Sequence, residues 1–187
     1  MKLRFRFVFV STCATLCALL VACATTAPTI ESRLTPGRIL DDELLTEAVR
    51  SAIRDEFRRN DLPYQINTVV LDGRVFLIGS VETQGHKDLV SDIVGDFRHV
   101  RNIQNELHIG DLRTAGEASQ DRRIATTARF QLINDPRTRA QEFELYVHKG
   151  TVYLIGITPR SVGYAAADIV KYVRGVQTVM LLIDYLD

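Results

Sequence analysis

The amino-acid sequence predicts an α+β protein that contains one small αββαβ unit twice, each copy with two helices packed on a three-stranded mixed sheet. The octapeptide DGRVFLIG at residues 72–79 returns 77 residues later as KGTVYLIG at 149–156, with five of eight positions identical. A repeat at this spacing indicates that one module of roughly 70 residues has been duplicated. Both copies alternate helical and strand-like apolar patterns, which is typical of helices that cover one face of a small sheet.

The first copy predicts a helix from residue 41, strands at 65–71 and 74–81, a helix at 84–97 and a strand at 100–109. Asp41 and Asp42 precede the apolar stripe of the first helix, so we expect them to cap it and to charge its first turn. The two strands are joined by Asp72-Gly73. Asp-Gly between apolar runs predicts a type I′ hairpin, because both central residues of that turn need positive φ.

The second copy predicts the same order, with a helix from Asp121, strands at 142–148 and 151–157 around Lys149-Gly150, a helix at 161–173 and a strand at 178–186. We therefore expect domains at 41–110 and 120–187, joined by a linker at 111–119. Each copy is near the size at which one core gives only modest stability. For that reason we expect the two copies to pack on each other.

The N-terminus predicts a bacterial lipoprotein. A basic start precedes an uncharged apolar run at 7–21, which is too short for a comfortable membrane span and long enough for a secretory signal. The run ends at Leu20-Val21-Ala22-Cys23, the pattern of a lipobox. We expect a signal peptide at 1–22, acylation of Cys23, and a lipidated flexible tether at 23–40. The alternatives are an ordinary signal-peptide cut at Ala22 or Ala24 and an uncleaved anchor helix.

The charges are unevenly divided between the two copies. Residues 41–110 hold 8 basic and 13 acidic side chains, whereas residues 119–187 hold 9 and 7. The first copy is therefore acidic and the second slightly basic, which is weak evidence that they meet different partners.

Motifs for catalysis and cofactor binding are missing from the pattern. The four histidines are spread over both copies with no helical pairing and no carboxylates clustered beside them: His86, His99, His108 and His148. Gly73 and Gly79 do not fit a phosphate loop, because no Gly-Lys-Ser/Thr follows them. We expect no enzyme, no metal, no cofactor, no small-molecule substrate and no nucleic-acid partner.

The repeated unit, with its central apolar-x-Gly-x-Val-x-Leu-x-Gly, resembles the BON domain of bacterial envelope proteins over residues 41–187. The stretch Gly116-Glu117-Ala118-Ser119, followed by Asp121, Ile124, Arg129, Gln131 and Leu132, resembles the outer-membrane lipoproteins that carry two such domains. The resemblance implies a non-catalytic protein on the periplasmic side of a Gram-negative outer membrane. It also implies a role in envelope integrity, with binding to anionic phospholipid, including at division sites, through the first helix of the second domain. The family has an aromatic membrane-facing residue near the start of that helix, where this chain has Arg123.

The first helices of the two copies differ on the face opposite their apolar stripe. In the second copy, Phe130 and Ile133 fall far from the stripe of Ile124, Ala128 and Leu132, so we expect them to be exposed or at an interface. Exposed apolar groups among arginines are typical of an interfacial membrane helix. The predicted phospholipid-binding residues are Arg122, Arg123, Thr126, Arg129, Phe130 and Ile133. The alternative is that Phe130 and Ile133 pack under the other domain or in a wider core.

Two functional hypotheses follow from different classes of protein. The first is a non-enzymatic lipoprotein that binds anionic phospholipid through its second domain. The second is a periplasmic scaffold, or regulator of an envelope-assembly or cell-wall-remodelling partner, that uses the same surface to bind a protein.

Overall fold

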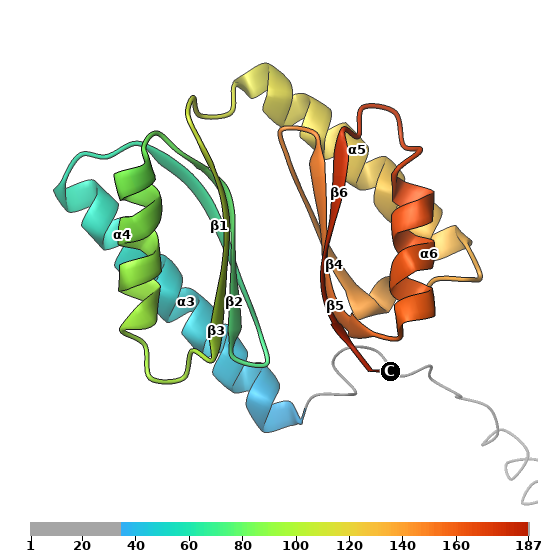
Figure 1. Cartoon of the computed structure of the whole chain (residues 1–187), viewed down its shortest axis with the longest axis horizontal. Helices are drawn as coiled ribbons and strands as arrows, with labels where there is room; N and C mark the ends of the chain where they lie inside the picture. Colours follow the sequence, from blue (N-terminus) through green and yellow to red (C-terminus); the bar gives the residue numbers. More distant parts are fainter. Residues whose placement is uncertain (1–34, 187) are drawn as a thin grey trace, which may run out of the picture.

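The computed structural model describes residues 35–186, which form two domains, each with helices on one face of a three-stranded sheet (Figure 1). The first domain consists of α3 (Pro36–Arg59), β1 (Tyr64–Leu71), β2 (Arg74–Val81), α4 (Gln84–Gly95) and β3 (Asn102–Ile109). The second consists of α5 (Ala115–Asn134), the short 3-10 helix η1 (Ala140–Glu142), β4 (Phe143–His148), β5 (Thr151–Thr158), α6 (Arg160–Val170) and β6 (Thr178–Tyr185). The predicted α+β fold with a duplicated αββαβ unit is confirmed. The predicted signal peptide, Cys23 and most of the predicted tether lie outside the described residues.

Each sheet is mixed, as predicted. β2 is antiparallel to β1 and parallel to β3, and β5 has the same relation to β4 and β6. The hairpins turn at Asp72-Gly73 and Lys149-Gly150, and these four residues have φ values between 47° and 75°. Positive φ at both central positions defines a type I′ turn, so the hairpin predictions are confirmed.

An aspartate on the first helix of each domain binds the hairpin turn of that domain. The carboxylate of Asp42 accepts hydrogen bonds from the backbone N–H groups of Asp72, at 2.7 Å, and Gly73, at 2.9 Å. In the second domain, the carboxylate of Asp121 accepts from Lys149, at 3.0 Å, and Gly150, at 2.9 Å. This repeated clamp aligns the two helices with an offset of 79 residues.

The prediction that Asp41 and Asp42 cap the first helix is wrong, because the helix begins earlier. Thr35 is the N-cap of α3 and its hydroxyl accepts from the Arg38 N–H. α5 also begins earlier than predicted, at Ala115, where Thr114 and Glu117 form a capping box. Residues 36–40 of the predicted tether and 115–119 of the predicted linker are therefore helical. Of the two aspartates predicted as caps, Asp42 binds the hairpin turn instead.

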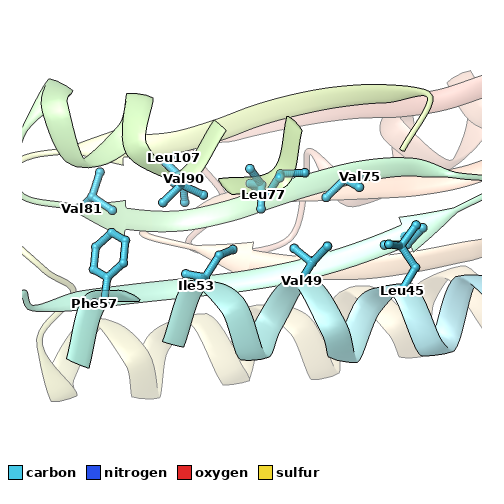
Figure 2. Close-up of a cluster of buried hydrophobic side chains, with 11 residues drawn as sticks. Leu45, Val49, Ile53, Phe57, Val75, Leu77, Val81, Val90 and Leu107 are labelled. Atoms are coloured by element: carbon cyan, nitrogen blue, oxygen red, sulfur yellow. The ribbon is translucent and has the colours of Figure 1, made fainter. Parts of the chain in front are cut away.

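Each domain has its own core between its helices and one face of its sheet. In the first domain, the α3 side chains Leu45, Val49, Ile53 and Phe57 point at the sheet (Figure 2). They meet β2 side chains including Val75, Leu77 and Val81, together with Val90 of α4 and Leu107 of β3 (Figure 2). In the second domain, the α5 residues Ile124, Ala128 and Leu132 face Val152 and Leu154 of β5 in the same way.

A third core joins the domains, because the two sheets pack face to face through the faces that carry no helix. Val69, Phe76 and Ile78 from the first sheet are buried against Tyr153, Ile155 and Leu182 from the second. The protein thus has four layers, with two sheets inside and a helical layer on each outer face (Figure 1). The expectation that the two copies pack on each other is confirmed.

Polar contacts also cross the boundary between the domains. Ser80 Oγ lies 2.5 Å from Nε2 of the buried His148, and Arg74 pairs with Asp184 at 3.4 Å. The Gln65 side chain of β1 forms two hydrogen bonds with the backbone of Arg113 just before α5, at 2.9 and 3.0 Å. The Arg113 side chain in turn binds Asp121 at 2.9 Å. These contacts tie the connecting segment to both domains.

Within residues 35–186, no helix combines the length and the apolar content that crossing a bilayer requires.

Replacing Gly73 with valine is expected to destabilise the first domain more than the same change at Gly150 destabilises the second. A Cβ at Gly73 would lie 2.9 Å from the backbone oxygen of His99, whereas at Gly150 the nearest atoms belong to the Gln177 side chain, at 3.1 Å. Both positions have positive φ, which costs an L-residue about 1–2 kcal/mol. Calorimetry should show a lower melting temperature for Gly73→Val. An unchanged transition would refute the turn assignment.

The stability of the protein is expected to fall in mild acid because of His148. The pKa of His148 is lowered from 6.5 to about 4, chiefly by burial and also by the positive charge of Arg113, against an opposing effect of Asp121. The folded state therefore keeps the ring neutral, and its full stability is present above about pH 6.5. That stability is lost as the pH falls through 6.5 towards about 4, by up to about 3 kcal/mol.

Thermal unfolding between about pH 7 and pH 4.5 tests this prediction, with His148→Gln as the comparison. The variant keeps a polar group facing Ser80 but cannot gain the charge, so its melting temperature should fall less with acid. Parallel curves for the two proteins would show that His148 does not carry the pH dependence.

Candidate functional site

The contacts that bury the inner face of α5 also determine which of its side chains point outward. The buried stripe of the helix consists of Asp121, Ile124, Ala128 and Leu132. Asp121 is fixed to the hairpin turn, so the rotation of the helix about its axis is set. At 100° per residue, the positions opposite this stripe point away from the sheet.

Two large apolar side chains lie on this outward face. Phe130 is 68% exposed and Ile133 is 70% exposed. The alternative in which they pack under the other domain or in a wider core is therefore wrong, because the first domain packs on the opposite side of the sheet. The face presents apolar groups to solvent that a soluble helix would normally bury or replace.

The other predicted residues surround this apolar pair. Arg122, Arg123 and Thr126 are exposed on the same helix. The Thr126 hydroxyl donates to the Arg122 carbonyl at 2.9 Å, so its hydrogen is engaged within the helix. Arg122 and Arg123 lie on the same outward side as Phe130, about two helical turns or roughly 10–12 Å before it along α5.

Arg129 differs from the other predicted residues because it also has a structural contact. Its Nη2 donates to the carbonyl of Leu145 on β4 at 2.9 Å. Arg50 occupies the equivalent position of α3, and its Nη2 donates to the carbonyl of Thr68 on β1 at 3.2 Å. A contact present in both copies belongs to the shared fold. Arg129 therefore adds positive charge at the edge of the face while it holds the helix to the sheet.

The apolar pair itself is absent from the first domain. With the helices aligned by their hairpin clamps, Ser51 occupies the position of Phe130, and Arg54 that of Ile133. Arg54 donates to Ser51 at 2.8 Å and lies 3.9 Å from Glu47. The equivalent face of α3 thus lacks the apolar pair, although it keeps one exposed apolar side chain, Leu44, at the position of Arg123.

A cavity of about 530 Å³ lies at the hairpin end of the first domain, lined by α3, the β1–β2 turn and the segment before β3. Two of its arginines pair with one aspartate, and Asp42 accepts from the backbone of the hairpin turn. Asp72 binds Arg38, and it binds Arg101 at 3.0 Å. In the described part of the chain, no three His, Cys, Asp or Glu side chains gather where a metal could bind. The cavity offers no nucleophile with an adjacent base among its lining residues.

Comparison with known families resolves the identity of the repeated unit. The BON domain family model matches residues 41–111 and again residues 120–186. The chain belongs to the BON-domain family. Both αββαβ units are BON domains, and the face described above lies on the first helix of the second one.

Relatives of known name share this two-domain length. The chain is 29% identical over 153 residues to a protein of Haemophilus influenzae named outer membrane lipoprotein DolP, covering 82% of this chain and 79% of the relative. It is 30% identical over 149 residues to a protein of Actinobacillus pleuropneumoniae named 21 kDa hemolysin, covering 80% and 76%. A solved structure of CdsD, a type III secretion protein of Chlamydia trachomatis, covers 74% of this chain and 92% of its own at 11% identity. Its TM-score of 0.32 is too low to carry an argument.

Helical periodicity did not identify every exposed large side chain. Tyr164 and Tyr172, at α6 and just after it, are 56% and 77% exposed, and Leu40 and Leu44 on α3 are 59% and 62% exposed. Leu40 lies in the segment predicted as tether, Leu44 lies on the outward face of α3, and the tyrosines lie outside the repeated apolar pattern. A position-by-position comparison of the second helices of the two copies would have revealed the tyrosines.

Proposed function

We propose that this BON-domain protein is a lipoprotein of the Gram-negative outer membrane, anchored through acylated Cys23 and facing the periplasm. The support is the lipobox at residues 20–23 and the named outer-membrane lipoprotein among its relatives. Three acyl chains, at about 0.8 kcal/mol per buried methylene, make such an anchor effectively permanent. The folded domains would then remain close to the bilayer at all times.

We further propose that the second BON domain binds anionic phospholipid through α5, and that this binding serves envelope integrity, including at division sites. The observation that carries the proposal is the exposure of Phe130 and Ile133 beside Arg122 and Arg123. Burial of a large apolar side chain contributes about 1.5–3 kcal/mol, and a basic side chain near an anionic surface contributes about 1 kcal/mol. The combined energy is modest, but the anchor raises the local concentration of the domain at the surface.

The proposed role is not enzymatic. Arg38, Asp72 and Arg101 in the cavity of the first domain are engaged in ion pairs, Asp42 is bound to the hairpin turn, and the α5 face carries no acid or base close to a nucleophile. The arrangement suits adhesion to a surface, for which apolar insertion and charge suffice.

Vesicle co-sedimentation of the chain from residue 24 onward, with Cys23 absent, tests the lipid-binding proposal. Phe130→Asp and Ile133→Asp should each lower affinity for phosphatidylglycerol vesicles about tenfold or more, because an apolar insertion is replaced by a like charge. Binding to phosphatidylcholine should be weak for every protein. Salt should weaken the binding of the unsubstituted chain, since it screens the arginines.

Ser51→Asp and Arg54→Asp are the matched controls, since they place the same carboxylates on the equivalent face of α3 and should change binding little. Circular dichroism should show all four variants folded, because Phe130 and Ile133 are largely exposed. Unchanged vesicle binding by the two α5 variants would exclude α5 as the lipid contact. Lost envelope function in those same variants would then favour the protein-binding scaffold.

A further inference from the structure

A second group of exposed side chains lies on the helical layer of the second domain, outside the α5 face. Tyr164 on α6 is 56% exposed, and Tyr172, two residues beyond the end of α6, is 77% exposed. Lys171 and Arg174 are exposed near Tyr172, and the Lys171 ammonium lies 4.8 Å from the centre of the Tyr172 ring. Tyrosine rings with neighbouring basic groups are the side chains that collect at membrane–water interfaces, where the ring is partly apolar and the hydroxyl stays hydrated.

This group lies on the same helical layer as the outward face of α5, and within that layer the Tyr164 ring lies 6.1 Å from the ring of Tyr185 on β6. Both helices cover the same face of the second sheet (Figure 1). Arg137, just beyond α5, lies 3.9 Å from Asp168 of α6, which also binds Lys171 at 2.6 Å. After α6, Gly175 packs closely against α5. A Cβ added at Gly175 would lie within 3.4 Å of side-chain atoms of Gln120 and Ile124. A flat surface that meets α5 would therefore extend towards the end of α6.

The first domain provides an internal comparison at the same positions. Aligning the second helices by their first residues, Gln84 and Arg160, gives an offset of 76 that also matches the buried pairs. Asp88 then occupies the position of Tyr164, and Asp96 that of Tyr172. Both aspartates are exposed. The two domains share their fold, so this exchange of acidic for aromatic side chains is not required by packing.

The exchange also changes the charge of the surface. Residues 160–174, which span α6 and the segment after it, hold three basic and one acidic side chain and so carry two net positive charges. The equivalent residues 84–98 of the first domain hold two basic and three acidic side chains and so carry one net negative charge. An anionic bilayer attracts the first surface and repels the second. Because the sheets pack between the helical layers, the two surfaces point to opposite sides of the molecule (Figure 1).

We propose that α6 and the segment just after it, through Tyr164, Lys171, Tyr172 and Arg174, form a second contact with the anionic bilayer. Together with α5 it lays the helical layer of the second domain on the membrane, and the acidic layer of the first domain faces away. This inference rests on the proposed function, since it assumes that the partner of α5 is a bilayer. It adds a second site and a single orientation.

The chain contains no tryptophan, so a single introduced tryptophan reports on its own position. We suggest Tyr164→Trp and Tyr172→Trp, with Asp88→Trp and Asp96→Trp as matched controls in the first domain and Phe130→Trp as the marker of α5 contact. The probe is a vesicle of equal parts phosphatidylglycerol and phosphatidylcholine, with and without brominated chains. Tryptophan at 164 and 172 should emit at shorter wavelength on binding and be quenched by the brominated lipid, and tryptophan at 88 and 96 should not.

The outcomes separate this inference from the function on which it rests. A response at 130 with none at 164 or 172 would overturn the second contact and leave α5 as the lipid site. No fluorescence response at any of the five positions would overturn both the second contact and the proposed lipid binding by α5. A response at 88 and 96 equal to that at 164 and 172 would overturn the single orientation. As a second readout, the double variant Tyr164→Asp, Tyr172→Asp should bind these vesicles severalfold more weakly and remain folded.

Discussion

The packing of the two sheets on each other determines which surfaces of the protein are available. β2 and β5 are central strands with both faces covered, one by the helices of their own domain and the other by the opposite sheet. Phe76 and Ile78 of β2 meet Tyr153 and Ile155 of β5 in that interface. A separated domain would expose this apolar sheet face, which is a hazard for aggregation. In the described residues, the broad surfaces that remain are two helical layers pointing in opposite directions.

Within each domain the frame is held by the same polar contacts, so the copies differ mainly at their surfaces. Asp42 and Asp121 bind the hairpin turns, and Arg50 and Arg129 bind carbonyls at equivalent positions of the first strands. These contacts fix the rotation of α3 and α5 and hence which side chains face outward. On that shared frame, the first domain carries mostly polar and acidic groups and the second carries Phe130 and Ile133 among arginines.

The sequence predicted what depends on local chemistry and missed what depends on distant contacts. The Asp72-Gly73 hairpin followed from the need for positive φ, and the exposure of Phe130 followed from helical phase. The predicted start of α3 is wrong because the sequence pattern does not distinguish an aspartate that caps its own helix from one that binds a turn 30 residues away. The packing of the two copies on each other was predicted from the small size of each core, but no local pattern identifies the sheet faces as the surfaces that meet. Helical periodicity does not predict Tyr164 and Tyr172, because single exposed aromatic residues form no periodic pattern.

The central claim is that one helical layer meets the bilayer while the other faces away. Amide line broadening by a gadolinium-labelled lipid, measured residue by residue by NMR on bilayers containing phosphatidylglycerol, tests it most directly. The account predicts broadening concentrated on the outward positions of α5 and around the end of α6, with α3 and α4 least affected. Broadening of equal strength in both helical layers, or strongest in α3 and α4, would contradict it.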